Sequence, residues 1–465
     1  MGITWESTST STLGSRSVDD GRFPRCALKS TRPERIWSIG RGPWLVAAVL
    51  LGALATPVAG QQEVRLGIRG YVDEKVNIAI DEVSPGNPVA RTVAEVLAFD
   101  LDYSLRFNVL EGRPGVVRSQ SPGPDYESWA IFGTEYLVTG SVTSTGAGYR
   151  ADVDIHHIPF QRSISRKSYA IPDPGSAGHR MAIHQISNAI IQELTGEEGI
   201  ADTRIAFASR RRGDKEIYAI DYDGHGSYRV TSLDTISMTP DWSRDGARIC
   251  FTTFVSGDPD LYCAPSGGGR SQPLSTNPGL DMAPSISPDG RRLALTLTKD
   301  GNAEIYVLDV GGRSLRRLTY NLGIDTAPSW SPNGRQIVFE SDRGGVAQIY
   351  AMDAEGANVR GLSSGGEAHS PAWSPQGDRI AYVERIGGRF QIVTMPADGG
   401  SGTVLTSTGD NEDPTWAPNG LHLAFSSTRG GGSDIYTMDW DGGNIRQVTR
   451  GGGYLSPTWS PKLGR

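Results

Sequence analysis

The sequence predicts an all-β propeller of six blades, preceded by a smaller N-terminal domain of the α/β or α+β class. The main observation is a repeated unit that opens with Pro-x-Trp-Ser-Pro or a close variant. Its first proline recurs every 43 or 44 residues, at Pro240, Pro284, Pro328, Pro371, Pro414 and Pro457. Four short apolar segments separated by Gly-rich turns fill each unit, and four strands in about 40–50 residues are the pattern of a propeller blade.

The unit that begins at Pro328 shows the predicted strands most clearly. They are expected at Pro328–Trp330, Gln336–Glu340, Gln348–Met352 and Val359–Ser363. Polar turns that contain Gly or Asp lie between them, which is typical of successive antiparallel strands.

The two ends of the repeat region predict how the ring closes. The C-terminus supplies only a first strand at 457–460, whereas the region opens with second, third and fourth strands at 204–209, 216–220 and 228–231. These parts complete one another as a composite blade, and five whole blades plus the composite make six. Such closure removes an open sheet edge, which would otherwise invite aggregation.

Composition limits the classes of function. The 465 residues include 59 Gly and 28 Pro, which suits a β protein rich in turns. The net charge of −7 gives no footprint of the kind that binds nucleic acid, so no nucleic-acid partner is expected.

Residues 1–60 are predicted to be a leader that contains a secretory signal peptide. Basic residues up to Arg41 precede an apolar core at 44–55, and small residues follow as far as Gly60. The apolar core is shorter than the roughly 20 residues that a membrane-spanning helix needs. Cleavage after Gly60 would leave Gln61 as the first residue of the mature chain. The stretch before the apolar core is unusually long for a signal peptide, so either the assigned start of the chain lies too far upstream or the basic region is extended.

Residues 61–200 are predicted to form the N-terminal domain, and residues 201–465 the propeller. Asn87 is placed to cap a helix whose first residue is Pro88, and Asp125 is placed to cap a short one. A last helix is expected over 178–194, with Gly196 at its end. The expected strands lie at 62–68, 76–80, 136–142 and 149–158.

Cys250 and Cys263 fall on the second and third strands of one predicted blade. The turn between them centres near Ser256, which places the two cysteines opposite one another. In an oxidising compartment they could form a cross-strand disulfide, and the alternative is two buried thiols. Neither has His or carboxylate partners at the spacing of a metal site.

An enzymatic function was considered because propellers also cap serine peptidases. Gly361–Gly365 matches the pattern of a nucleophile elbow. It falls on a predicted fourth strand with no helix after it, and no hydrolase domain fits beyond Arg465. We therefore expect no catalytic residues.

Three further motifs resemble metal sites. His156 and His157 lie on a predicted strand without a third ligand nearby in sequence, so a half-exposed strand pair is the favoured interpretation. Asp221–Gly224 and Asp439–Gly442 resemble pieces of a calcium loop but recur where hairpin turns are needed. No metal and no cofactor are expected.

The segments before the repeating prolines are the most informative for function. In a propeller these linkers connect the fourth strand of one blade to the innermost strand of the next, so all emerge at one end of the channel. Here they mix apolar, acidic and small residues, including 280–283, 324–327, 367–370, 411–413 and 454–456. A protein-binding surface is the favoured interpretation, and solvated loops are the alternative.

The repeat Pro-x-Trp-Ser-Pro-(Asp/Asn)-Gly, with Ile-Tyr-x-Met-Asp later in the unit, resembles that of the TolB family. The first domain strengthens the resemblance through Trp129–Gly140, Leu105–Leu110 and the junction 186–207. The resemblance covers residues 61–465.

The resemblance implies a non-enzymatic periplasmic scaffold of the Tol–Pal envelope system. Family members connect the lipoprotein Pal with inner-membrane TolA, support outer-membrane integrity and constriction at cell division, and are exploited by some colicins. A soluble monomer peripheral to the envelope is expected. The alternative is a propeller enzyme or a carbohydrate-binding module with its site in the channel.

The resemblance also implies two binding regions in this chain. The Pal-binding face would contain Leu280, Asp281, Ala283, Asp325, Thr326, Ala327, His369, Glu412 and Asp413. The TolA-binding N-terminus would contain Gln61, Gln62, Glu63, Val64, Arg65 and Leu66. The chain departs from the family pattern at Leu280, where a His or Asn is usual, and at Ala327, where a Glu is usual.

Overall fold

The computed structural model describes residues 75–81, 86–112, 123–212, 214–311 and 314–463. All of them fall within one compact unit of the chain, Leu66–Arg465. The predicted leader and the predicted strand at 62–68 lie outside the described residues.

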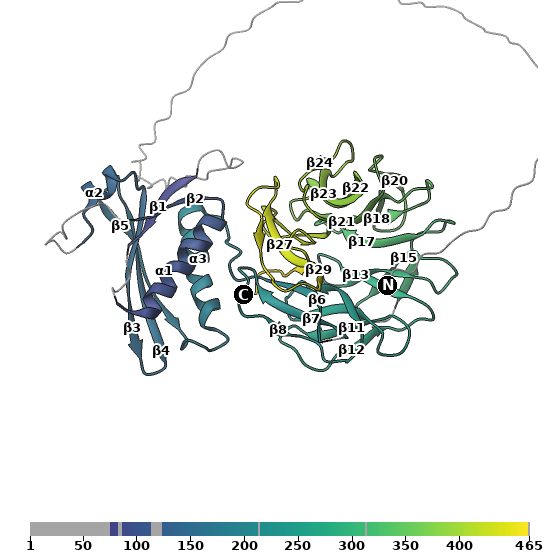
Figure 1. The fold of residues 1–465 in the computed structure, drawn as a ribbon, viewed down its shortest axis with the longest axis horizontal. Helices are drawn as coiled ribbons and strands as arrows, with labels where there is room; N and C mark the ends of the chain where they lie inside the picture. The colour runs from purple at the N-terminus through teal and green to yellow at the C-terminus, as the bar shows by residue number, and fades with distance from the viewer. Residues whose placement is uncertain (1–74, 82–85, 113–122, 213, 312–313, 464–465) are drawn as a thin grey trace, which may run out of the picture. The chain divides into compact units, whose positions relative to one another are not determined.

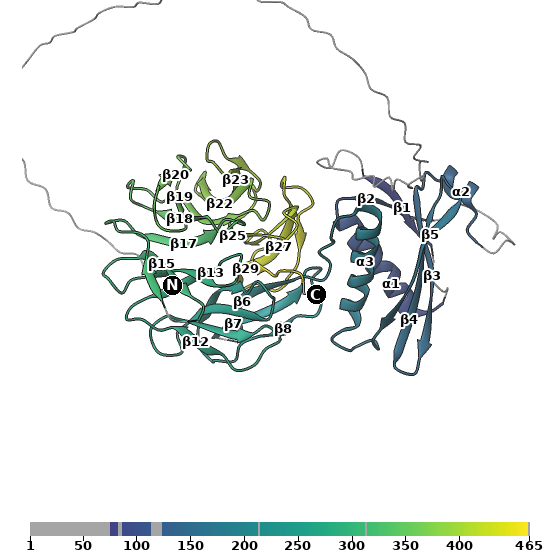
Figure 2. The same ribbon diagram turned by 180° about the vertical axis from the view of Figure 1, so that it is seen from behind.

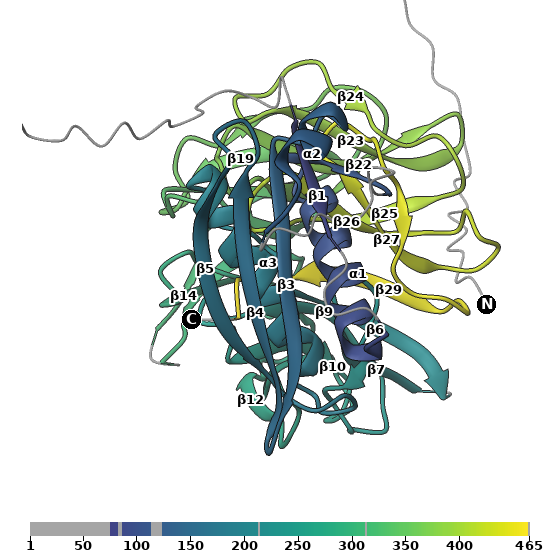
Figure 3. The ribbon, with the colours of Figure 1, turned by 90° about the vertical axis from the view of Figure 1, so that its left-hand side faces the viewer.

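The N-terminal domain is a mixed five-stranded sheet with helices packed on it (Figure 1). The strand order is β2-β1-β3-β4-β5; β1 is parallel to β2 and β3, while β3, β4 and β5 are antiparallel. The strands are β1 (Val76–Ile80), β2 (Phe107–Leu110), β3 (Tyr136–Thr145), β4 (Gly148–His157) and β5 (Arg162–Ile171). Figure 3 shows β3, β4 and β5 side by side.

Helices α1 (Pro88–Tyr103) and α3 (His179–Thr195) lie on the same face of this sheet (Figures 1 and 2). Their apolar residues and those of the strands form one buried cluster, which includes Val93, Leu97, Ile183, Ile186 and Val153. The short helix α2 (Tyr126–Ile131) instead contributes Trp129 to a second cluster with Ala79, Leu137 and Ile158.

The predicted helix ends are confirmed. The side chain of Asn87 accepts hydrogen bonds from the backbone N–H groups of Val89 and Ala90, and Pro88 occupies the first turn, where its missing N–H costs nothing. Asp125 caps α2 through the N–H of Ser128. Gly196 ends α3 with φ of 74°, a left-handed conformation that glycine adopts without strain.

The sequence analysis assigned no strand to β2 or β5. Strand β5 is an edge strand, and most of its side chains are exposed on both faces. Its sequence, Arg-Ser-Ile-Ser-Arg-Lys-Ser, therefore lacks the apolar alternation from which strands are predicted.

The propeller consists of six four-stranded sheets, as predicted. We number its blades along the chain, starting with the composite blade. Blade 1 contains β29 (Tyr454–Trp459), β6 (Arg204–Arg212), β7 (Asp214–Asp221) and β8 (Tyr228–Arg229). Blade 2 contains β9 (Ser237–Trp242), β10 (Arg248–Thr253), β11 (Asp260–Pro265) and β12 (Gln272–Ser275).

The other four blades repeat the same antiparallel order. Blade 3 contains β13 (Asp281–Ile286), β14 (Arg292–Leu297), β15 (Glu304–Asp309) and β16 (Leu315–Arg317). Blade 4 contains β17 (Asp325–Trp330), β18 (Gln336–Ser341), β19 (Gln348–Asp353) and β20 (Arg360–Gly361). Blade 5 contains β21 (Ala368–Trp373), β22 (Arg379–Ile386), β23 (Arg389–Pro396) and β24 (Thr403–Val404). Blade 6 contains β25 (Asn411–Trp416), β26 (His422–Ser427), β27 (Asp434–Asp439) and β28 (Arg446–Gln447).

The predicted closure of the ring by both ends of the repeat region is confirmed. Strand β29 pairs antiparallel with β6, with Tyr454 opposite Ser209 and Trp459 opposite Ile205 (Figures 1 and 2). Ser460 and Arg204 exchange two further hydrogen bonds, of 2.8 and 2.9 Å.

The repeated tryptophans connect neighbouring blades. The indole N–H of Trp242 donates to the carbonyl of Thr458 at 3.2 Å, and that of Trp330 donates to the carbonyl of Ser285 at 3.0 Å. Trp416 donates in the same way to the carbonyl of Ala372. Each of these bonds reaches the innermost strand of the preceding blade, so the residue that marks the repeat in the sequence also joins one repeat to the next.

The Thr or Ser that ends the unit has an equally local role in blades 1, 3, 4, 5 and 6. In blade 3, Thr319 Oγ1 accepts from the N–H of Ile305 at 2.9 Å and donates to the carboxylate of Glu304. Blade 5 repeats the arrangement with Thr406 and Gln391. The hydroxyl thereby fixes the fourth strand, which is only two to four residues long, to the third.

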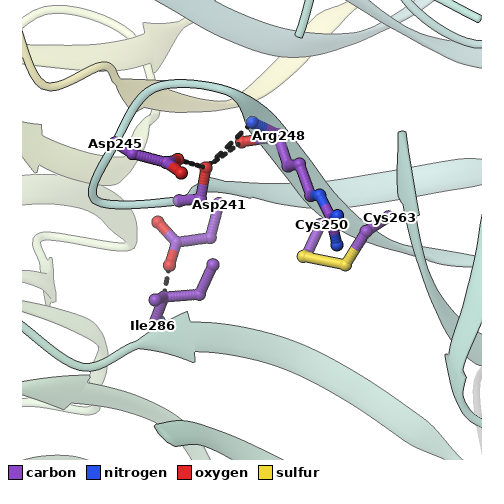
Figure 4. The surroundings of a disulfide bond; sticks show 7 residues. Asp241, Asp245, Arg248, Cys250, Cys263 and Ile286 are labelled. Atoms are coloured by element: carbon purple, nitrogen blue, oxygen red, sulfur yellow. Dashed lines mark hydrogen bonds between the residues drawn. A yellow bond between two sulfur atoms is a disulfide. The ribbon is translucent and has the colours of Figure 1, made fainter. Parts of the chain in front are cut away.

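Cys250 and Cys263 form a disulfide across β10 and β11, where they are directly opposite in the register (Figure 4). On the neighbouring strand β9, Asp241 accepts a hydrogen bond of 2.7 Å from the N–H of Ile286 in blade 3. The disulfide therefore crosslinks the second and third strands of blade 2, and the innermost strand of the same blade is hydrogen-bonded to blade 3.

We predict that removing residues 454–465 causes aggregation. The truncation would leave the edge of β6 unpaired and uncover the cluster in which Tyr454 and Trp459 pack with Ile205 and Phe207. Size-exclusion chromatography and thermal melting measure the effect, and removal of residues 464–465 alone is the control. A monomeric product with an unchanged Tm would contradict six-bladed closure.

Candidate functional site

The topology of the blades separates the two ends of the channel. Because the four strands of a blade alternate in direction, the linkers that enter each innermost strand lie at the same end as the turns between second and third strands. We call this end the mouth. The turns between first and second strands, and those between third and fourth, lie at the opposite end.

The contacts between the N-terminal domain and the propeller described here lie at that opposite end. Arg446, after the last turn of blade 6, donates to Asp102 of α1 at 2.8 Å. The ring of Tyr103 stacks on that of His422, which follows the first turn of the same blade, with centroids 4.1 Å apart. These contacts leave the mouth to other partners.

The innermost strands present matching positions around the mouth. The second position of each strand is held by Met238, Met282, Thr326, His369, Glu412 and Leu455. The third position is held by Thr239, Ala283, Ala327, Ser370, Asp413 and Ser456, all with φ between 46° and 53°. A left-handed conformation costs a residue other than glycine roughly 1–2 kcal/mol. Since it recurs in every blade, it belongs to the construction of the repeat.

Seven of the predicted mouth residues are accessible in the structure, at least in part. Leu280 is 41% exposed. Half-buried positions are held by Ala283, Thr326, Ala327, His369, Glu412 and Asp413.

The prediction that Asp281 and Asp325 belong to the binding surface is wrong for their side chains, because both are 0% exposed. Asp281 accepts from the hydroxyl of Ser275 at 2.7 Å and from the N–H of Asn277 at 2.9 Å. Asp325 pairs with the guanidinium of Arg343 at 2.8 Å. Both carboxylates hold the linker against its blade.

Large apolar side chains are exposed at the mouth. They lie on the linkers that enter blades 2, 3 and 4 and on the second turns of blades 2 and 4, and are Ile236, Val255, Leu280, Tyr320, Leu322, Ile324 and Val346. Leu322 is 102% exposed. Ile236, Val255, Tyr320, Leu322 and Val346 were not predicted from the sequence, although an apolar residue in an otherwise polar turn is a usable signal.

Acidic groups lie on the other side of the mouth. His369 Nδ1 is 3.0 Å from Glu340 Oε1, and its Nε2 is 3.5 Å from Glu367 Oε1. The hydrogen bond to Glu340 raises the pKa of His369 above its ordinary value. Burial raises the pKa of Glu412, and so does the neighbouring charge of Asp413.

A buried cluster that sequence reasoning missed joins the two domains. His184 of α3 is 0% exposed and lies between Asp100 of α1, at 2.8 Å, and Asp223 of the turn after β7, at 3.3 Å. Burial opposes protonation of His184, but hydrogen bonds to both carboxylates raise its pKa to about 9. Tyr222 also donates to Asp100. A histidine on the apolar face of a helix gives no signal that two carboxylates will meet it.

The motifs considered for chemistry have structural partners. His156 is hydrogen-bonded to Tyr126 and Thr139, each at 3.0 Å. Ser363 of the elbow-like motif donates to Gln348 and accepts from Ile349, so it ends a fourth strand. Asp221–Gly224 and Asp439–Gly442 close hydrogen-bonded turns. Among the described residues, no group of three His, Cys, Asp or Glu could hold a metal ion.

The opposite end of the channel opens into a cavity of about 530 Å³. Its wall includes Asp241, Trp330 and Trp416 and the prolines of the first turns. Residues Gln61–Leu66, the predicted TolA-binding segment, lie outside the described residues.

Comparison with known proteins decides the family. The family description "TolB beta propeller domain" matches residues 191–463, more than half of the chain. The chain belongs to the TolB family. The description "TolB amino-terminal domain" matches residues 64–162, so the predicted family and the predicted fold are both confirmed.

Relatives and a solved structure agree with this assignment to the TolB family. The "Tol-Pal system protein TolB" of Desulfosudis oleivorans is 34% identical over 213 residues, 43% of this chain and 48% of the relative. That of Geobacter sulfurreducens is 41% identical over 163 residues, 34% of this chain and 36% of the relative. The matches thus span about half or less of these curated relatives. The crystal structure of TolB from Acinetobacter baumannii superposes with a TM-score of 0.73 at 28% identity and covers 84% of this chain and 98% of its own.

No helix in the described part of this TolB-family chain has both the length and the apolar character that crossing a membrane requires.

We predict that the buried cluster gives stability that depends on pH. Because the pKa of His184 is raised from 6.5 to about 9, its stabilisation is fully present below about pH 6.5 and is lost as the pH rises through about 9. His184→Gln should lower the free energy of unfolding near pH 6.5 by on the order of 3 kcal/mol, and the difference from the unchanged chain should shrink by pH 10. Thermal melts across this range measure it, with His157→Gln as control. A difference that stays constant with pH would show that the histidine acts without its charge.

Proposed function

We propose that this TolB-family chain is a non-enzymatic periplasmic scaffold of the Tol–Pal system. In this proposal the mouth binds a Pal-type lipoprotein, and the mature N-terminus, Gln61–Leu66, binds a TolA-type inner-membrane protein. Joining these two partners would support outer-membrane integrity and constriction during cell division. The names of the relatives, all Tol-Pal system proteins, support this assignment.

The observation that carries the proposal is the exposed apolar surface at the mouth. Scattered exposed apolar residues are ordinary, but a group of them gathered at one end of a domain is typical of a protein-binding surface. Val255 of blade 2, Leu280 before blade 3 and Ile324 before blade 4 come from different blades and are exposed at the same end. The contacts with the N-terminal domain lie at the other end, so that domain leaves the mouth accessible to a partner.

A carbohydrate-binding or enzymatic site in the channel has less support. Aromatic rings that stack on sugars need an open face, whereas Trp242, Trp330 and Trp416 are nearly buried and bonded to the preceding blade. The channel carboxylates of Asp241 and Asp413 likewise accept hydrogen bonds from neighbouring blades.

Periplasmic placement rests on the predicted signal peptide at 1–60. The disulfide between Cys250 and Cys263 agrees with an oxidising compartment.

We predict that Thr326→Lys weakens binding of the Pal-type lipoprotein. Thr326 is half-buried at the second position of β17, and a bulky cation there would be desolvated at the interface centre. Such penalties cost about 2–4 kcal/mol, which is a loss of roughly 30-fold or more. Calorimetric titration measures it.

Thr403→Lys is the matched control, because Thr403 is exposed on the outer strand β24. Asp325→Lys is unsuitable, since it would break the buried pair with Arg343 and unsettle the fold. A Thr326→Lys variant that binds the lipoprotein normally but loses TolA would contradict the assignment of the two regions.

We also predict that deleting residues 61–68 abolishes binding of the TolA-type protein and leaves lipoprotein binding unchanged. An extended segment at a chain end can add a strand to the sheet edge of a partner. The same titrations, with circular dichroism to confirm the propeller, measure both effects. Retained TolA affinity after the deletion would place that site elsewhere.

A further inference from the structure

Two sectors of the mouth differ in their main chemistry, although the exposed Asp258 lies within the first and the exposed Ile386 within the second. The apolar sector, on blades 2 to 4, consists of Ile236, Val255, Leu280, Tyr320, Leu322, Ile324 and Val346. The acidic sector lies on blades 4, 5 and 6. It consists of Glu340, which is near the second turn of blade 4, and of Glu367, Asp410, Glu412 and Asp413. A partner that covers the whole mouth must therefore satisfy both kinds of surface.

Part of the acidic sector is neutralised within the chain. Glu340 and Glu367 contact His369, and Glu367 also pairs with Arg385 at 3.2 Å. Asp410, Glu412 and Asp413 form no ion pair with any described residue. Within the acidic sector, the unneutralised charge is thus concentrated where β25 begins.

Asp413 is the one charged residue among the third positions of the six innermost strands. Its carboxylate accepts hydrogen bonds from Ser370 Oγ at 3.3 Å and from Ser456 Oγ at 3.0 Å, which belong to the two neighbouring blades. Two hydroxyl donors hold it in place without cancelling its charge.

The ionised forms of these carboxylates are unfavourable in the free chain. Burial raises the pKa of Asp413 and that of Glu412, so their charges are held at a cost to stability. The groups that act on Glu412 are Asp413 and Asp410, which oppose its ionisation, and His369, which favours it. A cation supplied from outside would offset that cost.

We propose that the protein bound at the mouth presents an apolar segment to the apolar sector and places one Arg or Lys side chain against Glu412 and Asp413. This inference rests on the proposed function and specifies the chemistry of the same partner. The apolar contacts bury surface area of both proteins, and the cation sets the orientation of the bound segment. A segment bound in the reverse orientation would bring its apolar groups against unpaired carboxylates. An acidic group at that point of the partner would be repelled.

The test uses the full chain and the Pal-type lipoprotein of the same cell without its lipid. Titrations at about 50 and 300 mM salt compare the unchanged chain with the double variant Glu412→Gln, Asp413→Asn. Both replacements keep the shape of the side chain, and each exchanges one acceptor oxygen for an NH2 donor to which a serine hydroxyl can turn its lone pair. Asp398→Asn, at a fully exposed carboxylate in a turn at the opposite end, is the control.

The double variant should bind at least tenfold more weakly at low salt, and the loss should shrink at high salt because ion pairs are screened. Its Tm should rise, since two unfavourable charges are removed. The control should bind within twofold of the unchanged chain.

If the double variant binds as tightly as the unchanged chain, the inference falls and the proposed function stands. A loss that is equal at both salt concentrations would also overturn it, since that would indicate a change of shape. If the unchanged chain does not bind the lipoprotein at all, both the inference and the proposed function fall.

Discussion

The hydrogen-bonded pairing of β29 with β6 is the constraint on which the rest of the propeller depends. It joins segments more than 240 residues apart and turns a row of six sheets into a ring. Only in a ring do the innermost strands converge, so that Ser370, Asp413 and Ser456 from successive blades come within hydrogen-bonding distance. Which side chains come together at the mouth therefore depends on closure of the ring as well as on the sequences of the linkers.

The fold was largely predictable because its signals are local and repeated. Pro-x-Trp marks most of the innermost strands, and Asn87 with Pro88 marks the start of a helix. Such signals are reliable because only a few residue types suit a given backbone position, such as the first turn of a helix. Strand β5 was missed for the opposite reason: an edge strand with exposed faces has no apolar period. The position of β5 is set by its pairing with β4, and the sequence of β5 alone does not indicate that pairing.

The site was predictable only in outline. An acidic residue before a repeating proline looks like surface charge, yet Asp325 is buried and paired with Arg343, which lies 18 residues later in the turn between β18 and β19. Asp413, two residues into β25, remains half-buried and unpaired among the described residues because the matching positions of blades 5 and 1 carry serines. The difference between the two aspartates is set by partners that only the closed ring brings together. The same holds for His184, whose partners come from another helix and another domain.

The composite blade also imposes an order of events on a chain that is synthesised from its N-terminus. Blades 2 to 6 each consist of consecutive strands and can form as soon as their own segment emerges. Blade 1 has three strands near the start of the propeller and stays one strand short until β29, close to residue 460, has arrived. Completion of the ring therefore waits for β29, and a chain arrested before that strand has been made would present an unpaired edge to whatever chaperone or protease it meets.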